Sequence, residues 1–217
     1  MSETKKKFSM RKMALVVMVV GGIISIALQL ANRSPSVNIP QELKGVVLPQ
    51  PRPLTPFTLT DHNNKPFNLS RLQGNWTFLF FGYTHCPDIC PTAMAELAEV
   101  FESLNQNSQT PLNTQGVFVS VDPERDRPET LKDYVPFFHP DFIGATGSAE
   151  QIKHFTKQLG AAYMISPEKD EQGDYLVSHA SAFFLINPKG EFYAAFQGAM
   201  SNPEKISQSY LKIRSIN

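Results

Sequence analysis

The feature that most constrains the fold is a short apolar run at residues 77–81, which leads within a few residues to the chain's only two cysteines, Cys86 and Cys90. Such a run is typical of a strand that is buried on both faces of a sheet. Pro91 suits the first position of a helix, and apolar side chains follow it at helical spacing: Met94, Leu97, Phe101 and Leu104. The sequence therefore predicts a buried strand, a loop that holds Cys86, and a helix with Cys90 at or beside its N-cap.

Several other short segments have the pattern of strands. Residues 54–60 and 66–69 flank a polar turn and form a candidate hairpin. Two further segments, 117–121 and 142–145, are apolar and strand-like. A second hairpin is expected from residues 182–186 and 191–196, which are joined by Asn187-Pro188-Lys189-Gly190.

Three more helices are expected between and after these strands. Asp126 and Glu129 match a capping box around Pro128, which predicts a helix to about residue 135. Another helix is marked by the spacing of Ile152, Phe155 and Leu159, and a last one starts near Pro203. This alternation, with the cysteine pair between the first buried strand and its helix, resembles a thioredoxin-like fold. We therefore predict an α/β protein with a thioredoxin-like central sheet flanked by helices.

The N-terminus has the pattern of a membrane anchor. Residues 1–12 contain five basic side chains, and residues 13–31 are almost entirely apolar. Nineteen helical residues span roughly 28 Å, close to the ~30 Å thickness of a bilayer core. Because basic residues stay on the cytoplasmic side, we expect a single-pass inner-membrane protein with a cytoplasmic N-terminus and a periplasmic domain, or the equivalent mitochondrial intermembrane space. A cleaved signal peptide is the alternative, but it would have a shorter apolar region.

The remainder of the chain is expected to be a spacer and one domain. Residues 32–53 are rich in proline, which favours an extended linker, and residues 54–217 have the length of a single domain. The whole chain contains 20 basic and 20 acidic residues, but its first 31 residues hold five of the basic ones and one acid. The exported part therefore has 15 basic and 19 acidic residues, and its net charge of about −4 argues against nucleic acid as a partner.

The two cysteines have two possible chemistries. At the start of a helix both sulfurs approach its positive end, which favours the thiolate, although Asp88 lies between them and opposes this. A thiolate is both the attacking group in disulfide exchange and a soft ligand for Cu(I). Three residues separate the cysteines instead of the two of thioredoxin-type catalysts, which leaves room for an ion but still permits a disulfide. A purely structural disulfide is the third reading, and so short a loop would contribute little to stability.

His179 precedes the expected strand at residues 182–186, about where thioredoxins place the residue that faces their cysteine pair. An imidazole at that position would complete a site of two sulfurs and one nitrogen. Such a site suits Cu(I), and Cu(II) if a further ligand is added. On spacing alone, however, a histidine beside a strand is more often packed or exposed than bound to a metal.

Three separated motifs together resemble the Sco/SenC family of membrane-anchored copper proteins. They are the segment from Phe81 to Thr92, the segment Ser120-Val121-Asp122-Pro123-Glu124-Arg125-Asp126, and the segment from Asp174 to His179 with the following Phe184–Gly190 stretch. The resemblance implies a thioredoxin fold that binds one copper per chain through Cys86, Cys90 and His179. Asp174 resembles a family acid upstream of the histidine, so it could orient His179, and the alternative is a solvated loop residue. Asp122 ends a buried strand at the edge of the sheet where the active-site loops gather, so it could also support the site, and the alternative is a cap of the following turn.

The resemblance further implies a role in assembling the binuclear copper centre of cytochrome c oxidase. Members of the family are implicated in passing copper to subunit II, in reducing its cysteines, or in both. The sequence therefore predicts a copper-binding metallochaperone, and the alternative is a thiol–disulfide oxidoreductase that acts through Cys86 and Cys90. The implied partners are subunit II, a second copper chaperone as donor and a thioredoxin-like reductant. A thioredoxin-like peroxidase is a third reading, but no hydrogen-bond donors for a peroxide could be identified.

Overall fold

The computed structural model describes residues 13, 15–22, 25, 39–107, 113–169, 175–179, 181–197 and 202–216. The chain forms two compact units, residues 1–38 and 39–217. Of the expected anchor, residues 13–31, the structure describes residues 13, 15–22 and 25. Among those that are described, none of the helices has both the length and the apolar character needed to cross a bilayer.

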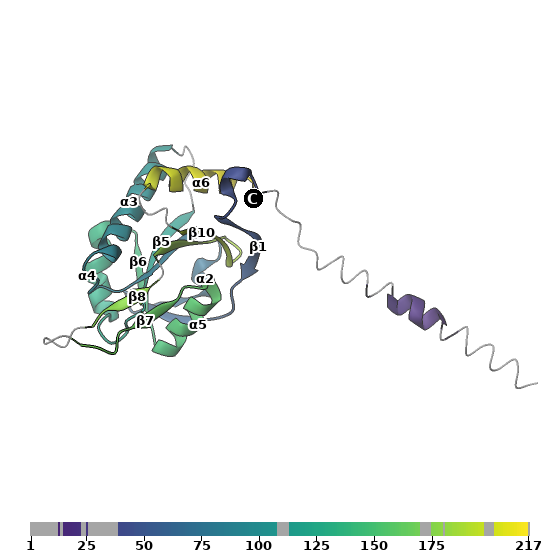
Figure 1. Cartoon of the computed structure of the whole chain (residues 1–217), viewed down its shortest axis with the longest axis horizontal. Helices are drawn as coiled ribbons and strands as arrows, with labels where there is room; N and C mark the ends of the chain where they lie inside the picture. The colour runs from purple at the N-terminus through teal and green to yellow at the C-terminus, as the bar shows by residue number, and fades with distance from the viewer. Residues whose placement is uncertain are drawn as a thin grey trace, which may run out of the picture. The chain divides into compact units, whose positions relative to one another are not determined.

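The domain is built on an eight-stranded mixed sheet with the order β1-β10-β9-β4-β5-β6-β2-β3 (Figure 1). Its three central strands, β4, β5 and β6, are parallel, and the other pairs are antiparallel. The strands are β1 (Val47–Pro53), β2 (Thr58–Asp61), β3 (Pro66–Asn68), β4 (Trp76–Gly82), β5 (Thr114–Ser120), β6 (Ile143–Thr146), β9 (Ala182–Ile186) and β10 (Glu191–Gln197). All seven residues of β4 are buried, as the apolar run at residues 77–81 predicted.

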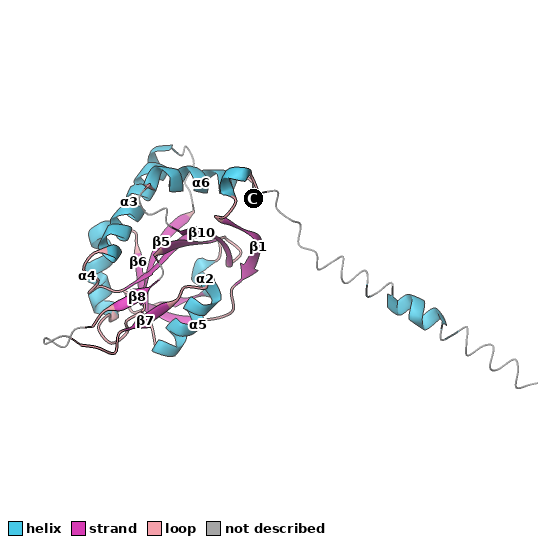
Figure 2. Ribbon diagram, viewed as in Figure 1, coloured by secondary structure: helices cyan, strands magenta, loops and turns pink. Residues whose placement is uncertain are grey.

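Helices cover both faces of this sheet, and Figure 2 shows the strands inside and the helices outside. The helices are α2 (Leu69–Leu72), α3 (Ile89–Asn107), α4 (Pro128–Phe138), α5 (Ala149–Leu159) and α6 (Pro203–Ser215). Phe78 of β4 packs against rings from α3 and α6, whereas Phe81 points to the other face and meets Phe155 of α5. A central sheet flanked by helices in this order confirms the predicted α/β, thioredoxin-like architecture.

Strand β1 lies within the segment that was expected to be a linker. Val47–Pro53 pair with β10, and the compact unit begins at Ile39, so residues 39–53 belong to the domain and not to a free spacer. The prolines indicated a linker, and this prediction was wrong for residues 39–53. The reason is that β1 lies at one edge of the sheet. An edge strand leaves one side unpaired, and prolines are tolerated there because they lack only an N–H that has no partner strand.

Two helix starts also differ from the sequence-based expectation. Helix α3 begins at Ile89, and the Asp88 carbonyl accepts the Thr92 N–H at 3.3 Å, so Cys90 lies in the first turn and not at the cap. Pro91 is tolerated because the N–H groups of a first turn have no acceptor within the helix. Asp126 does not cap α4, whose N-cap residue is Arg127. The carboxylate of Asp126 instead turns into the protein.

A second, two-stranded sheet stands beside the first. Its strands are β7 (Tyr163–Ile165) and β8 (Val177–His179), and Tyr163 lies opposite His179 in the antiparallel register. We call this pair the β7–β8 ribbon. It is the element that brings His179 to the rest of the domain.

The packing between α5 and the sheet leads to a stability prediction. Phe155 is fully buried, stacks on Phe57 with ring centroids 4.0 Å apart, and meets the edge of Phe81. Replacing Phe155 by alanine is expected to lower the free energy of unfolding by about 3–5 kcal/mol. The matched control is Phe137→Ala, since Phe137 is 84% exposed, and its effect should stay within about 0.5 kcal/mol. Equal urea midpoints for the two variants would contradict this packing.

Candidate metal centre

The three candidate ligands meet at one end of the sheet. The sulfur atoms of Cys86 and Cys90 and a ring nitrogen of His179 all lie within 4.8 Å of one another. The Cys90 Sγ lies 3.2 Å from the His179 Nε2. Both cysteines are free thiols, so the pair is in its reduced form. The structure thus brings together the residues that the sequence singled out.

Cys86 is held in the loop between β4 and α3. Its backbone N–H donates to the Tyr83 carbonyl at 3.3 Å, which closes a turn. Its sulfur accepts a hydrogen bond from the backbone N–H of Cys90 at 3.3 Å. That N–H belongs to the first turn of α3, where donors have no partner inside the helix. The sulfur of Cys86 therefore takes the place of a capping side chain at the helix N-terminus.

Cys90 is fully buried against the end of β4. A Cβ atom at Gly82 would lie 2.9 Å from the Cys90 sulfur and 2.8 Å from a ring carbon of Phe118. Both distances are too short for real atoms, so only glycine leaves room for the sulfur at this point of β4. The apolar strand and the cysteine are in this way packed as one unit.

The environments of the two thiols push their pKa values in opposite directions. Burial raises the pKa of Cys86, but hydrogen bonds from the backbone of Asp88, Cys90 and Ile89 and from the Cys90 thiol outweigh it, so this pKa is lowered. Burial raises the pKa of Cys90 strongly, the backbone of Tyr83 offsets this only in part, and the neighbouring Cys86 and Asp126 raise it further. Cys86 is therefore the thiol of the pair that loses its proton more readily.

His179 ends strand β8 and is half-buried. The imidazole meets two aromatic rings edge-on: Phe80 at 5.6 Å and 85°, and Tyr83 at 6.2 Å and 82° between ring planes. Phe80 comes from β4 and Tyr83 from the cysteine loop, so the aromatic walls that flank the imidazole belong to the same segment that positions the sulfurs.

Of the two acids that were expected to orient the site, Asp122 and Asp174, the structure describes only Asp122. Asp122 is buried, but its carboxylate accepts hydrogen bonds from Arg125 at 2.6 Å and from the Tyr175 hydroxyl at 2.7 Å, and its side chain is not part of the group formed by the sulfurs and the imidazole. Asp174 lies outside the described residues.

Asp126, which the sequence assigned to a helix cap, supports the cysteine loop instead. It is fully buried and accepts hydrogen bonds from the Thr84 N–H at 2.8 Å and the Ser120 hydroxyl at 2.6 Å. His85 approaches the same carboxylate at 3.8 Å. Because Thr84 is two residues before Cys86, this carboxylate ties the cysteine loop to the end of β5. Asp126 lies six positions after the last residue of β5, so no local pattern in the sequence marked it as a partner of this loop.

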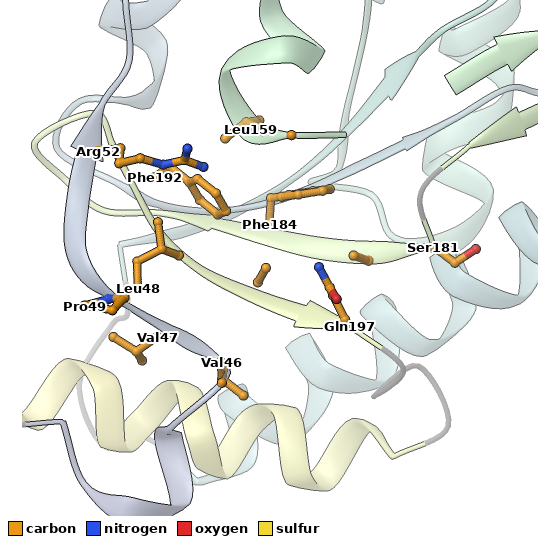
Figure 3. A pocket seen from close by; sticks show the side chains of 14 residues that line it. Val46, Val47, Leu48, Pro49, Arg52, Leu159, Ser181, Phe184, Phe192 and Gln197 are labelled. Carbon is orange, nitrogen blue, oxygen red and sulfur yellow. The ribbon is translucent and has the colours of Figure 1, made fainter. Parts of the chain in front are cut away.

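Two cavities along the described residues are lined by neither cysteine and not by His179. Figure 3 shows one of about 780 Å³, lined in part by Phe184 of β9 and Phe192 of β10, with Arg52 beside the Phe192 ring. Another, of about 560 Å³, is lined by His85 and Pro87 of the cysteine loop and by Arg125 and Tyr175. The second leaves open space immediately beside the candidate metal centre.

The donor set and its spacing fit a soft metal ion. Sulfur and nitrogen ligands lie ~2.0–2.3 Å from a bound metal, so two donors of one ion are at most ~4.6 Å apart. The observed limit of 4.8 Å needs only a small closure. The same two sulfurs, one with a lowered pKa and the other buried with a raised pKa, can also attack and resolve a disulfide. The site thus defines a thioredoxin-like protein built for soft-metal binding, thiol exchange or both.

Comparison with known proteins assigns the family. The model of the SCO1/SenC family matches residues 48–214, and the chain belongs to that family. The mouse (Mus musculus) mitochondrial SCO2 homolog is 40% identical over 153 residues, which cover 70% of this chain and 59% of that protein. This chain therefore matches less than two thirds of the length of that relative.

Solved structures support the same assignment. Arabidopsis thaliana ScoI with copper bound is 36% identical, has a TM-score of 0.67, and the match covers 74% of this chain and 98% of that one. Yeast Sco1 with copper bound is 29% identical, has a TM-score of 0.70, and the match covers 77% of this chain and 91% of that one.

The unequal environments of the thiols predict unequal reactivity. Iodoacetamide should alkylate Cys86 at least about tenfold faster than Cys90 in the reduced native chain, because Cys86 is partly exposed and its thiolate is stabilised. The rates are measured in Cys90→Ser and Cys86→Ser, each of which leaves one thiol. In urea the two variants should react at similar rates. Similar rates in the native state would contradict the assigned roles.

Proposed function

We propose that the chain binds one copper ion through Cys86, Cys90 and His179 and carries it as a metallochaperone. The convergence of these three donor atoms within 4.8 Å is the observation that carries the proposal. Thiolate and imidazole ligands select Cu(I), and a three-donor site satisfies it without a fourth protein ligand. Cu(II) would require one ligand more. The copper bound in the Arabidopsis and yeast structures supports the choice of metal.

The proposed destination of the copper is the binuclear centre of cytochrome c oxidase subunit II. This follows from family membership, because Sco/SenC proteins are implicated in assembling that centre. We place the domain outside the inner membrane, in the periplasm or the intermembrane space, anchored by residues 13–31. A second copper chaperone would load the site, and the open space lined by His85 and Pro87 lets a partner approach the partly exposed Cys86.

The second candidate function is reduction of the cysteines of that apo site, and the split between the two thiols favours it. The Cys86 thiolate would attack a sulfur of the partner's disulfide and release one partner thiolate. The Cys90 sulfur, after losing its proton, would then attack Cys86, release the second partner thiolate and close a Cys86–Cys90 disulfide. Two electrons pass to the partner, and a thioredoxin-like reductant would restore the dithiol.

Copper binding is tested by titrating the reduced chain with Cu(I) against a competing chelator. We expect one tightly held copper per chain and a loss of about 10–100-fold in affinity for His179→Ala, because one of three ligands is removed. His154→Ala is the control, since His154 lies on α5 and bonds to Thr55 and Pro56. Equal affinities for wild type and His179→Ala would rule out the proposed site.

The reductase function predicts a trapped intermediate. With an oxidised peptide that contains two cysteines, Cys90→Ser should accumulate a mixed disulfide at Cys86, because the second thiol is missing. Cys86→Ser should trap much less, since Cys90 is buried and protonated. Mass spectrometry of the non-reduced adduct measures both. If neither variant forms an adduct, the thiol-exchange function is wrong and metal carriage remains.

A further inference from the structure

The β7–β8 ribbon, which carries His179, is not paired with the main sheet. In the described ranges β7 and β8 hydrogen-bond as strands only to each other. The ribbon is therefore positioned by side-chain contacts rather than by a strand ladder. Tyr175 and Val177, at its entry, are buried and face the domain.

Three side chains join the entry of β8 to the loop that follows β5. The Nε of Arg125 donates to one oxygen of Asp122 at 2.6 Å, and the hydroxyl of Tyr175 donates to the other at 2.7 Å. Arg125 Nη2 also donates to the backbone carbonyl of Tyr175 at 3.0 Å. These bonds form a closed ring, which we call the Asp122 clamp.

The clamp is buried and charged, which makes its bonds strong. Asp122 is fully buried, and only 9% of Tyr175 is exposed. The Arg125 guanidinium lies 3.7 Å from the centroid of the Tyr175 ring. Hydrogen bonds to ionised groups in such surroundings are stronger than neutral ones. Burial and the bond to Asp122 raise the pKa of Tyr175 to about 12, so its hydroxyl remains a donor at neutral pH.

The clamp also reaches the cysteine loop. The Arg125 guanidinium lies 5.5 Å from the centroid of the Tyr83 ring. Tyr83 in turn meets the imidazole of His179 edge-on and closes the turn that holds Cys86. One arginine therefore contacts both the segment that leads to the sulfurs and the segment that leads to the nitrogen.

We propose that the Asp122 clamp is the positioning device that fixes His179 over the two cysteines. Asp122, Arg125 and Tyr175 are positioning residues, since none of them is among the three candidate metal donors. Three residues of mostly extended chain lie between Tyr175 and His179, so a displacement at the clamp also displaces the imidazole. The inference rests on the proposed metal-binding function for its second test, but not for its first.

The first test needs no metal and uses Tyr175→Phe, which removes one hydroxyl and retains the ring over Arg125. In the reduced apo chain, hydrogen–deuterium exchange at Val177–His179 should become about tenfold faster, because a buried bond to a charged group is lost. Exchange in β4 should not change. Tyr193→Phe is the matched control, since its hydroxyl is buried without a hydrogen-bond partner in the described structure. It should leave exchange in the ribbon unchanged.

The second test measures Cu(I) affinity by chelator competition in a double-mutant cycle. Tyr175→Phe should weaken binding about tenfold in the wild-type background. In the His179→Ala background it should cause no further loss, because the clamp then has no ligand to position. A second variant, Arg125→Lys, keeps the charge but loses the forked geometry, and it should give the same pattern if Tyr175→Phe folds poorly.

The outcomes separate this inference from the proposed function. Unchanged exchange at β8, or faster exchange that includes β4, would overturn the clamp. Equal losses of affinity in both backgrounds would also overturn it, since they would show an effect that does not pass through His179. If the wild-type chain holds no Cu(I), the proposed metal function fails, and the exchange experiment still decides whether the clamp fixes β8.

Discussion

The contact between Cys90 and His179 joins two residues that lie 89 positions apart, and the candidate site depends on it. One side of the contact is rigid: Cys90 is buried against β4, where Gly82 alone leaves room for its sulfur. The other side comes from the β7–β8 ribbon, which has no strand pairing to the main sheet within the described residues. The site is thus assembled from a fixed pair of sulfurs and a nitrogen whose position is set separately.

Metal carriage and thiol exchange use the same two sulfur atoms, so they exclude one another at any moment. A disulfide removes both thiolate ligands, whereas a bound copper occupies the nucleophile. The opposite pKa shifts of Cys86 and Cys90 suit thiol–disulfide exchange, in which one thiol attacks first and the second then resolves the mixed disulfide. His179 suits metal binding, since disulfide exchange gains nothing from a soft-metal ligand. The three residues together therefore favour a metal carrier that retains thiol chemistry.

The sequence predicted the strand–loop–helix unit around the cysteines because an apolar run, a cysteine pair and a helical stripe are local signals. It failed at β1, where prolines that indicated a linker are tolerated at a sheet edge. It also assigned Asp126 to a helix cap, although its carboxylate accepts hydrogen bonds from Thr84 and Ser120 instead. The family resemblance strengthened the prediction of His179 as a ligand. The hydrogen bond between Tyr175 and Asp122 could not be predicted, because two residues 53 positions apart leave no local pattern in the sequence.

The proposed carrier function requires that the chain both hold and release its metal, and the division of the site between the core and the β7–β8 ribbon is compatible with both. The sulfurs are fixed by backbone hydrogen bonds and core packing, so their geometry resists change. The imidazole is fixed through a few side chains, which a docking partner can reach by way of the open space lined by Arg125 and Tyr175. Moving the nitrogen while the sulfurs stay in place would lower the number of ligands from three to two. Release would then require no unfolding of the domain, only a shift of the ribbon that holds His179.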